Sequence, residues 1–199
     1  MRKDSDPHPD EAVTILLSEL NRGLEQRGGR VQAEIREAQP SDAKQLVAFV
    51  HELCEETDID IALERGEFKI TTEQERGLLE KYASSENSIF LVADVDGTIV
   101  GVLTCLGRGH AARQHVTSLG VSVARAWRNQ GIGNALLEGA LEWARSSGVV
   151  FRIELNVFAR NAAAIHLYKK HGFKVEGSRR KAVLRNDEYL DDLEMAVLL

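Results

Sequence analysis

The chain has 199 residues, of which 43% are hydrophobic, and its formal net charge is −6. This length and composition allow one full hydrophobic core, so we expect a single domain with a short appendage. The acidic balance argues against a protein that follows nucleic-acid phosphates. We also expect no membrane span, because no apolar run approaches the required length. The first residues, "MRKDSDPHPDEAV", lack the apolar segment of a signal peptide, which predicts a cytoplasmic location.

Residues 1–30 are predicted to form an extension that contains an amphipathic helix. Between Asp10 and about Gln26, apolar residues recur at helical spacing: Val13, Leu16, Leu17, Leu20 and Leu24. The "RGG" that follows breaks this pattern. A leucine stripe of this kind would pack on the domain or on a partner subunit, and it offers one contact for a homodimer.

Residues 31–199 are predicted to form one α+β domain. A strand at "VQAEIREAQ" precedes two helices, the first opened by Pro40 and Ser41 and the second capped by Thr71 or Thr72. Later segments predict a hairpin around "DG", a strand at "HVTSLGVSV", a helix to about residue 147, a strand at "FRIELNVF", a helix at "NAAAIHLYKKHG", and two strands joined at "ND". The predicted order is β-α-α-β-β-β-α-β-α-β-β, which favours a mixed sheet.

The chain contains two cysteines, Cys54 on a helical apolar face and Cys105 at the end of an apolar strand. Their wide separation favours ordinary buried thiols. We expect no metal site.

The segment "RNQGIGNALLEGALEWA" opens a helix in an unusual way. Gly131 and Gly133 stand at the predicted helix start, and the first acid after them, Glu138, comes more than a turn later. The first turn of a helix leaves backbone amides without partners, and glycine lets an anion approach them. The pattern is typical of a diphosphate site, although a tight strand-to-helix turn would explain it too. A Walker loop is disfavoured because no Lys-Ser or Lys-Thr follows, and a dinucleotide fingerprint is disfavoured because its third glycine is replaced by Leu136.

Basic residues also gather near the C-terminus at Arg179, Arg180, Lys181 and Arg185. Such a cluster could receive a small anion, or it could be a solvated face.

Two segments in this order, "HVTSLGVSVARAWRNQGIGNALLEGALEWA" and "ELNVFARNAAAIHLYKKHGFKVEG", resemble the GNAT superfamily of acyl-CoA-dependent N-acyltransferases. The C-terminal segment is similar to the branch that acetylates amino acids, phosphinothricin-like compounds and polyamines. The resemblance covers about residues 31–199. It implies a mixed, mostly antiparallel sheet of six to seven strands with four flanking helices, and acetyl-CoA as cosubstrate.

The resemblance also implies where the coenzyme lies. Main-chain groups of Val121 and Val123 would pair with the pantetheine arm. The amides around the glycines would hold the diphosphate, at Asn129, Gln130, Gly131, Ile132, Gly133 and Asn134. Arg128 would add positive charge, or it could be a solvated loop residue. Asn161 would cap the next helix and could also hydrogen-bond the coenzyme.

Tyr168 matches the family's general acid, which donates a proton as the thiolate leaves, while a packed aromatic is the alternative. The general base is less defined, because Ser118 stands where related enzymes carry a glutamate. Glu154 on the next strand is the nearest acidic substitute, His115 a weaker one, and a water chain is a further route.

The implied reaction is direct transfer of an acetyl group to a primary amine of a small molecule in a ternary complex. The stretch Glu52, Glu55, Glu56, Asp58, Asp60 and Glu64 could attract a cationic amine and so favour polyamines, or it could be a solvated surface. The C-terminal segment resembles amino-acid acetylating relatives equally well. Alternatives are a protein N-terminal or lysine acetyltransferase and a non-catalytic acyl-CoA-binding module.

Overall fold

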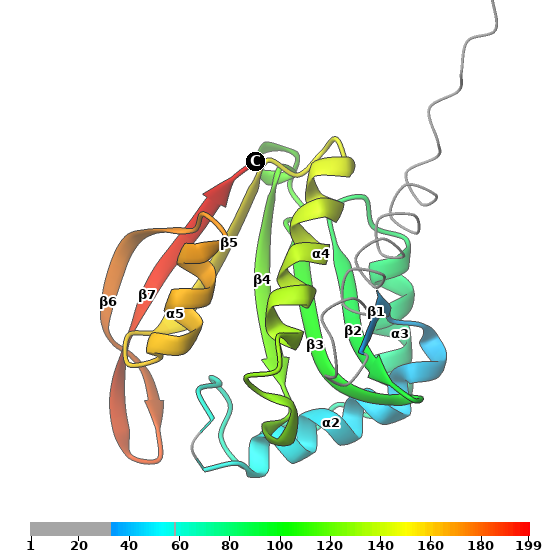
Figure 1. The fold of residues 1–199 in the computed structure, drawn as a ribbon, viewed down its shortest axis with the longest axis horizontal. Helices are drawn as coiled ribbons and strands as arrows, with labels where there is room; N and C mark the ends of the chain where they lie inside the picture. The colour runs from blue at the N-terminus through cyan, green and yellow to red at the C-terminus, as the bar shows by residue number, and fades with distance from the viewer. Residues whose placement is uncertain (1–32, 58) are drawn as a thin grey trace, which may run out of the picture.

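A computed structural model of the chain describes residues 33–57 and 59–199. The order of helices and strands in this part is the predicted one (Figure 1). The leucine-rich helix expected at 10–26 and the expected domain boundary near residue 30 lie outside the described residues, so both stay predictions.

Seven strands form one sheet in the order β1-β2-β3-β4-β5-β7-β6. All neighbours are antiparallel except β4 and β5, which run parallel. This confirms the mixed, mostly antiparallel sheet. The strands are β1 (Glu34–Glu37), β2 (Ile89–Val95), β3 (Thr98–Gly107), β4 (Val116–Val123), β5 (Arg152–Phe158), β6 (Lys174–Arg185) and β7 (Glu188–Leu198).

The two predicted hairpins form at the predicted turns. Asp96 and Gly97 both have positive φ between β2 and β3, as do Asn186 and Asp187 between β6 and β7. Asn, Asp and Gly are the residues that tolerate this left-handed backbone, and two such residues in a row match the right-handed twist of the flanking strands. Local sequence is therefore sufficient to fix both turns.

In the part of the chain that the structure describes, four helices flank the sheet, namely α2 (Ala43–Glu55), α3 (Thr72–Ala83), α4 (Ile132–Ser146) and α5 (Ala162–Lys170). Of the two expected caps of α3, Thr71 is the one used, because its side chain accepts a hydrogen bond from the Gln74 amide. Short 3₁₀ turns occupy Pro40–Asp42, Ala111–Arg113 and Arg125–Trp127. Within the described residues, no helix has the length and apolar character needed to cross a membrane.

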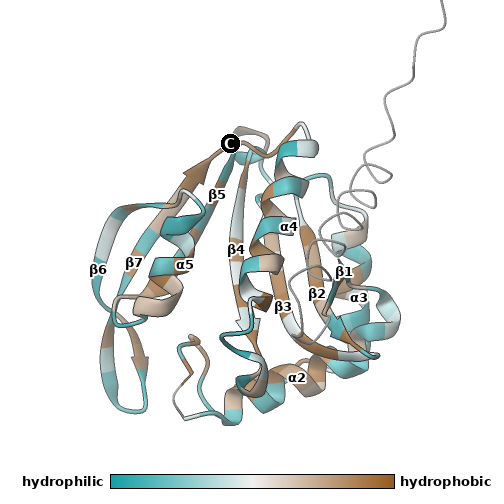
Figure 2. Ribbon diagram, in the orientation of Figure 1, coloured by the Kyte–Doolittle hydropathy of each residue, from teal (hydrophilic) through white to brown (hydrophobic). Residues whose placement is uncertain are grey.

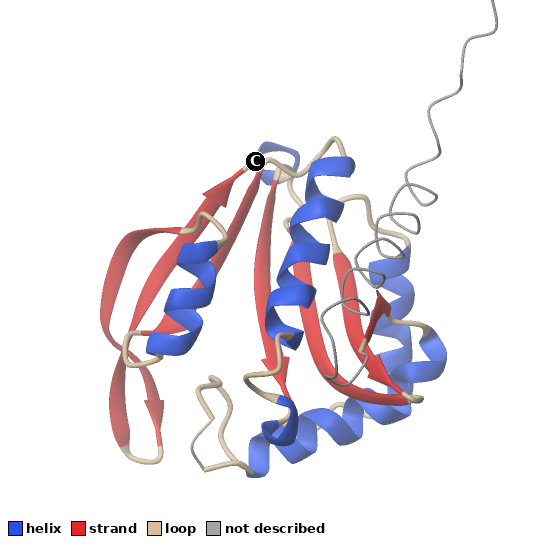
Figure 3. Cartoon of the chain, in the orientation of Figure 1, coloured by secondary structure: helices blue, strands red, loops and turns tan. Residues whose placement is uncertain are grey.

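The helices divide between the two faces of the sheet, α4 and α5 on one face and α2 and α3 on the other (Figure 3). The larger core lies under α4 and includes the fully buried Leu136 and Leu137, together with Ile153 of β5. The smaller core lies under α2 and α3 and includes Leu46 and Leu79. Figure 2 shows the apolar strands that both layers cover in the middle of the sheet.

The sheet is open in one place. β4 and β5 are paired at only three positions, from Val116–Arg152 to Ser118–Glu154. Beyond Ser118 the two strands separate, and Figure 1 shows the gap widening toward the start of α4. The main-chain groups of β4 that face this gap have no β5 partner, so pairing with β5 does not exclude a ligand from this edge.

Candidate active site

The start of α4 presents main-chain amides and no acidic side chain. Gly131 is the N-cap residue, with a φ of 91°, and no side chain caps this helix. The first helical hydrogen bond runs from the Ala135 amide to the Gly131 carbonyl at 3.0 Å, so the amides of residues 131–134 precede the helical ladder. With no acid in the first turn, the positive end of the helix dipole is not neutralised. These amides can therefore bind an anion.

The two glycines contribute differently. A Cβ on Gly131 would meet nothing within 4 Å, but its positive φ is one that L-residues rarely adopt. A Cβ on Gly133 would lie 3.6 Å from Cδ2 of Leu167 and 3.9 Å from Cγ2 of Val123, which is ordinary contact. The left-handed turn thus needs glycine at 131, while position 133 has room for a methyl group that packs on α5.

Arg128 is directed toward other groups of the chain. Its Nε donates to the Val123 carbonyl at 2.9 Å, and its Nη2 lies 2.7 Å from Oε2 of Glu56. This ion pair joins the end of β4 to the end of α2. The Val123 carbonyl, one of the groups expected to face the pantetheine arm, is already an acceptor in this bond.

Two further side chains of the loop are also engaged within the chain. Nε2 of Gln130 donates to the Ala126 carbonyl at 2.8 Å. Oδ1 of Asn134 accepts from Nζ of Lys170 at 2.8 Å and lies 2.9 Å from Nε2 of His171. Burial lowers the pKa of His171. The anion-binding capacity of this loop therefore rests mainly on its backbone.

A cavity of about 480 Å³ lies in the opening between β4 and β5. Leu119 and Val121 line it from the α4 side of the sheet, with Leu167 and Tyr168 of α5. Side chains alternate between the two faces of a strand, so Thr104 of β3 and Ser122 of β4 lie on the face opposite α4. They line the cavity from that face. Leu167, which also lies next to Gly133, connects the cavity to the start of α4. The cavity thus lies close to the helix start and is lined from both faces of the sheet.

Tyr168 is 6% exposed and lines this cavity. Its ring packs on Phe173 with 5.7 Å between the ring centroids. Burial raises the pKa of the Tyr168 phenol to about 12, so it is protonated at any physiological pH. A protonated hydroxyl in a largely apolar wall can donate a proton to a leaving group in the cavity.

Asn161 lines the same cavity and caps α5, since its Oδ1 accepts from the Ala164 amide at 3.0 Å. The expected capping role is confirmed. A contact with the coenzyme stays a prediction.

Glu154 lies where β4 and β5 are still paired, and it is not among the residues that line the cavity. Its carboxylate accepts from Arg108 at 2.8 Å and from Arg152 at 3.3 Å, and Arg113 lies 3.7 Å away. Burial raises the pKa of Glu154, but these hydrogen bonds outweigh it and lower the pKa below the ordinary value of 4.5. A carboxylate held ionised by arginines is a weak proton acceptor. His115, the other candidate, is exposed at the same end of β4.

Arg179 and Asp192 were not predicted from the sequence as site residues, yet both line the cavity. The basic cluster near the C-terminus was the available signal for Arg179. Nothing local marks Asp192, because its place depends on β7 lying between β5 and β6.

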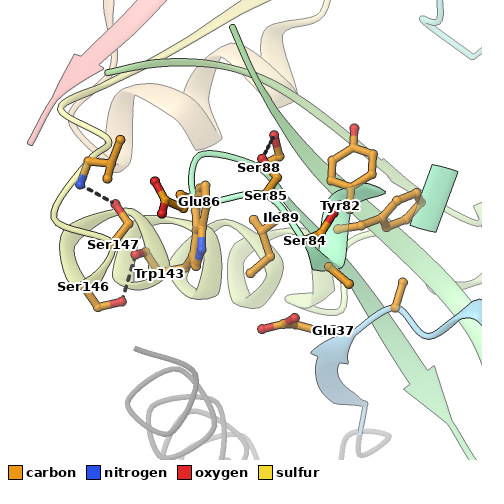
Figure 4. A pocket seen from close by; sticks show the side chains of 14 residues that line it. Glu37, Tyr82, Ser84, Ser85, Glu86, Ser88, Ile89, Trp143, Ser146 and Ser147 are labelled. Carbon is orange, nitrogen blue, oxygen red and sulfur yellow. Dashed lines mark hydrogen bonds between the residues drawn. The ribbon is translucent and has the colours of Figure 1, made fainter. Parts of the chain in front are cut away.

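A second cavity, of about 440 Å³, lies at the opposite end of α4 (Figure 4). Trp143 and Ser146 of α4 line it together with Tyr82 of α3. Since α4 has 15 residues, this cavity is about 20 Å from the helix start at 1.5 Å per residue. Its serines bond within the chain, for example Ser85 to Ser88 at 2.9 Å. It is therefore separate from the anion-binding helix start.

A mixed sheet opened between two parallel strands, with unneutralised helix amides beside the opening, defines the acyl-CoA N-acyltransferase class of fold. The solved structures agree. A GNAT acetyltransferase from Streptococcus pneumoniae aligns with a TM-score of 0.81 and 38% identity, covering 84% of this chain and 99% of that one. The Salmonella typhimurium protein yncA, described as a putative acetyltransferase with its cofactor acetyl-CoA, shares the fold with a TM-score of 0.74 and 21% identity, covering 84% and 94%.

The chain belongs to the acetyltransferase (GNAT) family, whose model matches residues 48–173. It is 44% identical over 106 residues to the L-amino acid N-acetyltransferase AaaT of Escherichia coli; the match covers 53% of this chain and 65% of that protein, so somewhat less than two thirds of the relative is spanned. It is 36% identical over 100 residues to the N-alpha-acetyltransferase RimI of Mycobacterium tuberculosis, covering 49% and 60%. The family and the acyltransferase fold inferred from the two motifs are thereby confirmed.

Proposed function

We propose that this protein transfers the acetyl group of acetyl-CoA to the amine of a small molecule of the amino-acid type. The observation that carries the proposal is the cavity between β4 and β5, which is lined by Tyr168 and by Leu167, the residue that also lies next to Gly133 at the start of α4. A diphosphate bound at the helix start would leave the pantetheine arm free to enter this cavity. Amine and thioester would then be held together, which supplies most of the rate gain of such a transfer.

In this proposal the coenzyme is bound chiefly by main-chain groups. The amides from Asn129 to Asn134 hold the diphosphate, as the absence of an acid in the first turn of α4 allows. The unpaired edge of β4 at Val121 and Val123 receives the pantetheine arm, in the way that a sheet edge receives an added strand. Arg128 contributes by fixing the end of β4, because its guanidinium is already bound to Val123 and Glu56.

Tyr168 acts as the general acid that protonates the departing thiolate. Its phenol lines the cavity, and its raised pKa keeps it protonated. We do not assign the base to Glu154, because this carboxylate binds arginines outside the cavity. The ammonium of the acceptor instead loses its proton to water in the cavity, which is open to solvent through the separated strands.

The charges support an amino acid as acceptor better than a polyamine. Three of the six acids in the stretch that could attract a polyamine are paired with arginines: Glu55 with Arg65 at 3.1 Å, Glu56 with Arg128 at 2.7 Å and Asp60 with Arg160 at 3.0 Å. This pairing weakens the attraction of the stretch for a cationic ligand. The similarity to an L-amino acid N-acetyltransferase points the same way.

The test is release of thiol from acetyl-CoA in the presence of single acceptors: free amino acids, spermidine, and peptides with a free N-terminus. We expect turnover on at least one amino acid. Turnover on peptides alone would overturn the proposal in favour of protein N-terminal acetylation, which the similarity to RimI raises as the second candidate. Tight acetyl-CoA binding without turnover on any amine would make the protein a binding module.

A further inference from the structure

One ion pair in the cavity takes no part in the proposed binding of the coenzyme or in the proposed proton donation by Tyr168. Arg179 of β6 and Asp192 of β7 lie opposite each other in register, and both line the cavity. Asp192 is 2% exposed, and both of its carboxylate oxygens are taken by Arg179: Oδ1 accepts from Nε at 2.8 Å, and Oδ2 accepts from Nη2. The Arg179 side chain is 46% exposed.

This geometry fixes the plane of the guanidinium. A two-bonded arginine–carboxylate pair has one preferred orientation, and Asp192 is held in place by its burial between two strands. The N–H groups of Nη1 lie outside this pair. Glu194 is the next carboxylate, with its Oε1 3.7 Å from Nε of Arg179, again on the side away from Nη1. Arg179 is therefore an oriented donor with capacity for a second anion.

Strand register places this donor on the side of the sheet opposite Tyr168. Phe158 of β5, Asp192 and Arg179 are consecutive partners across β5, β7 and β6, so their side chains share one face. Their neighbours Val157 and Leu193 belong to the core on the α4 and α5 face, where Tyr168 lies. The cavity thus has Tyr168 on the coenzyme side and Arg179 on the other side.

Arg179 is the one cationic side chain that lines this cavity in the described part of the chain. The other two charged lining residues are the paired Asp192 and Asp60, the latter bound to Arg160 at 3.0 Å. If the acceptor places its amine near the thioester, the other end of the acceptor molecule lies against Arg179. The group that best matches the planar fork of a guanidinium is a carboxylate.

We propose that Arg179, oriented by Asp192, binds the carboxylate of the acceptor and thereby selects amino acids over amines that lack one. This inference rests on the proposed function and assigns its acceptor subsite. Arg179 is a binding residue in this scheme, and Asp192 is a positioning residue that acts through it.

The first test uses the wild-type enzyme and the amino acid that it acetylates best. The matching amino-acid amide has the same side chain and amine but no negative charge, and we expect its kcat/KM to be lower by about tenfold or more, because a charged hydrogen bond is lost. Equal kcat/KM values for acid and amide would overturn the inference while leaving the acetyltransferase proposal intact. Failure of the wild type on every amino acid would overturn the proposed function itself.

The second test replaces the side chains. Arg179→Gln should raise the KM for the amino acid by about 10- to 100-fold, leave the KM for the amide and for acetyl-CoA unchanged, and change kcat little. Arg179→Lys should restore part of the preference for the acid, and Asp192→Asn should raise the same KM by a smaller factor. Arg180→Gln removes the same charge from an exposed neighbour outside the cavity lining and should behave as wild type.

An equal rise in KM for acid and amide in Arg179→Gln would refute a carboxylate contact, since it would reflect a general distortion. Thermal unfolding of each variant checks the fold. If Arg179→Gln does not fold, Arg179→Lys carries the test, because it keeps a cation beside Asp192. A lysine variant whose acid-over-amide preference is reduced supports the contact of the guanidinium with the carboxylate, and an unchanged preference and KM contradict it.

Discussion

Replacing Gly131 by alanine tests whether the start of α4 needs a left-handed residue. A Cβ at this position has free space, so the whole cost comes from the φ of 91°. That cost is roughly 1–2 kcal/mol, which corresponds to a fall in Tm of about 2–8 °C for a domain of this size. If the backbone relaxes instead, the amides of residues 131 and 132 turn away from the anion site. Losing one charged hydrogen bond weakens binding of acetyl-CoA by about tenfold or more.

Gly133→Ala is the matched control, two residues further along the same helix. Its Cβ would make ordinary contact with Leu167, at 3.6 Å, and alanine favours a helix over glycine by up to about 1 kcal/mol. We expect an unchanged or slightly higher Tm. We also expect an acetyl-CoA affinity within about threefold of wild type, because a change in contact energy below about 1 kcal/mol alters a dissociation constant by no more than about this factor. Calorimetric titration with acetyl-CoA and thermal unfolding measure both quantities. Equal loss of affinity in the two variants, or a Gly131→Ala variant with neither a lower Tm nor a weaker affinity for acetyl-CoA, would refute this account of the loop.

Further outcomes follow from three parts of the structure: Tyr168, Glu154 and the two buried cysteines. Tyr168→Phe keeps the packing on Phe173 but removes the proton donor, so kcat should fall by about 100-fold or more with acetyl-CoA affinity unchanged; a kcat near wild type would exclude Tyr168 as the acid. Glu154→Gln should change kcat by no more than about twofold, because Glu154 lies outside the cavity. Because the pKa of Glu154 is lowered in the folded state, its ion pairs stabilise the fold above pH 4.5, and this stabilisation is lost as the pH falls through the folded pKa. In denaturant titrations, the free energy of unfolding of the glutamine variant should therefore fall less with decreasing pH than that of wild type. Cys54 and Cys105 are buried and burial raises the pKa of both thiols, so a thiol reagent should modify neither in the native protein and both after unfolding; rapid labelling of the native chain would contradict their placement in the cores.

The open start of α4 was predictable because its cause is local. A glycine at the helix start and the lack of an acid before Glu138 are properties of neighbouring residues, and the structure has both features at the N-terminus of α4. What the loop sequence did not reveal is how its side chains are used. Arg128 binds Glu56, 72 positions earlier in the chain, and Asn134 binds Lys170 of α5.

The acceptor side of the cavity was less predictable, because its charges depend on partners far apart in sequence. The acidic stretch indicated a cation-binding surface, yet Asp60 meets Arg160 across 100 positions. Glu154 was the nearest acid to the expected base, yet strand pairing places it among arginines at the closed end of the β4–β5 pair.

The sequence by itself determined the order of helices and strands, the two hairpin turns and the open helix start, since periodicity, turn residues and capping act over a few neighbouring positions. The tertiary structure alone decided which charges stay available to a ligand. Insertion of β7 between β5 and β6 brings Asp192 against Arg179 inside the cavity, and the same folding pairs three of the six acids of the acidic stretch with arginines. Ion pairing depends on distance in space, which no short segment of the chain specifies.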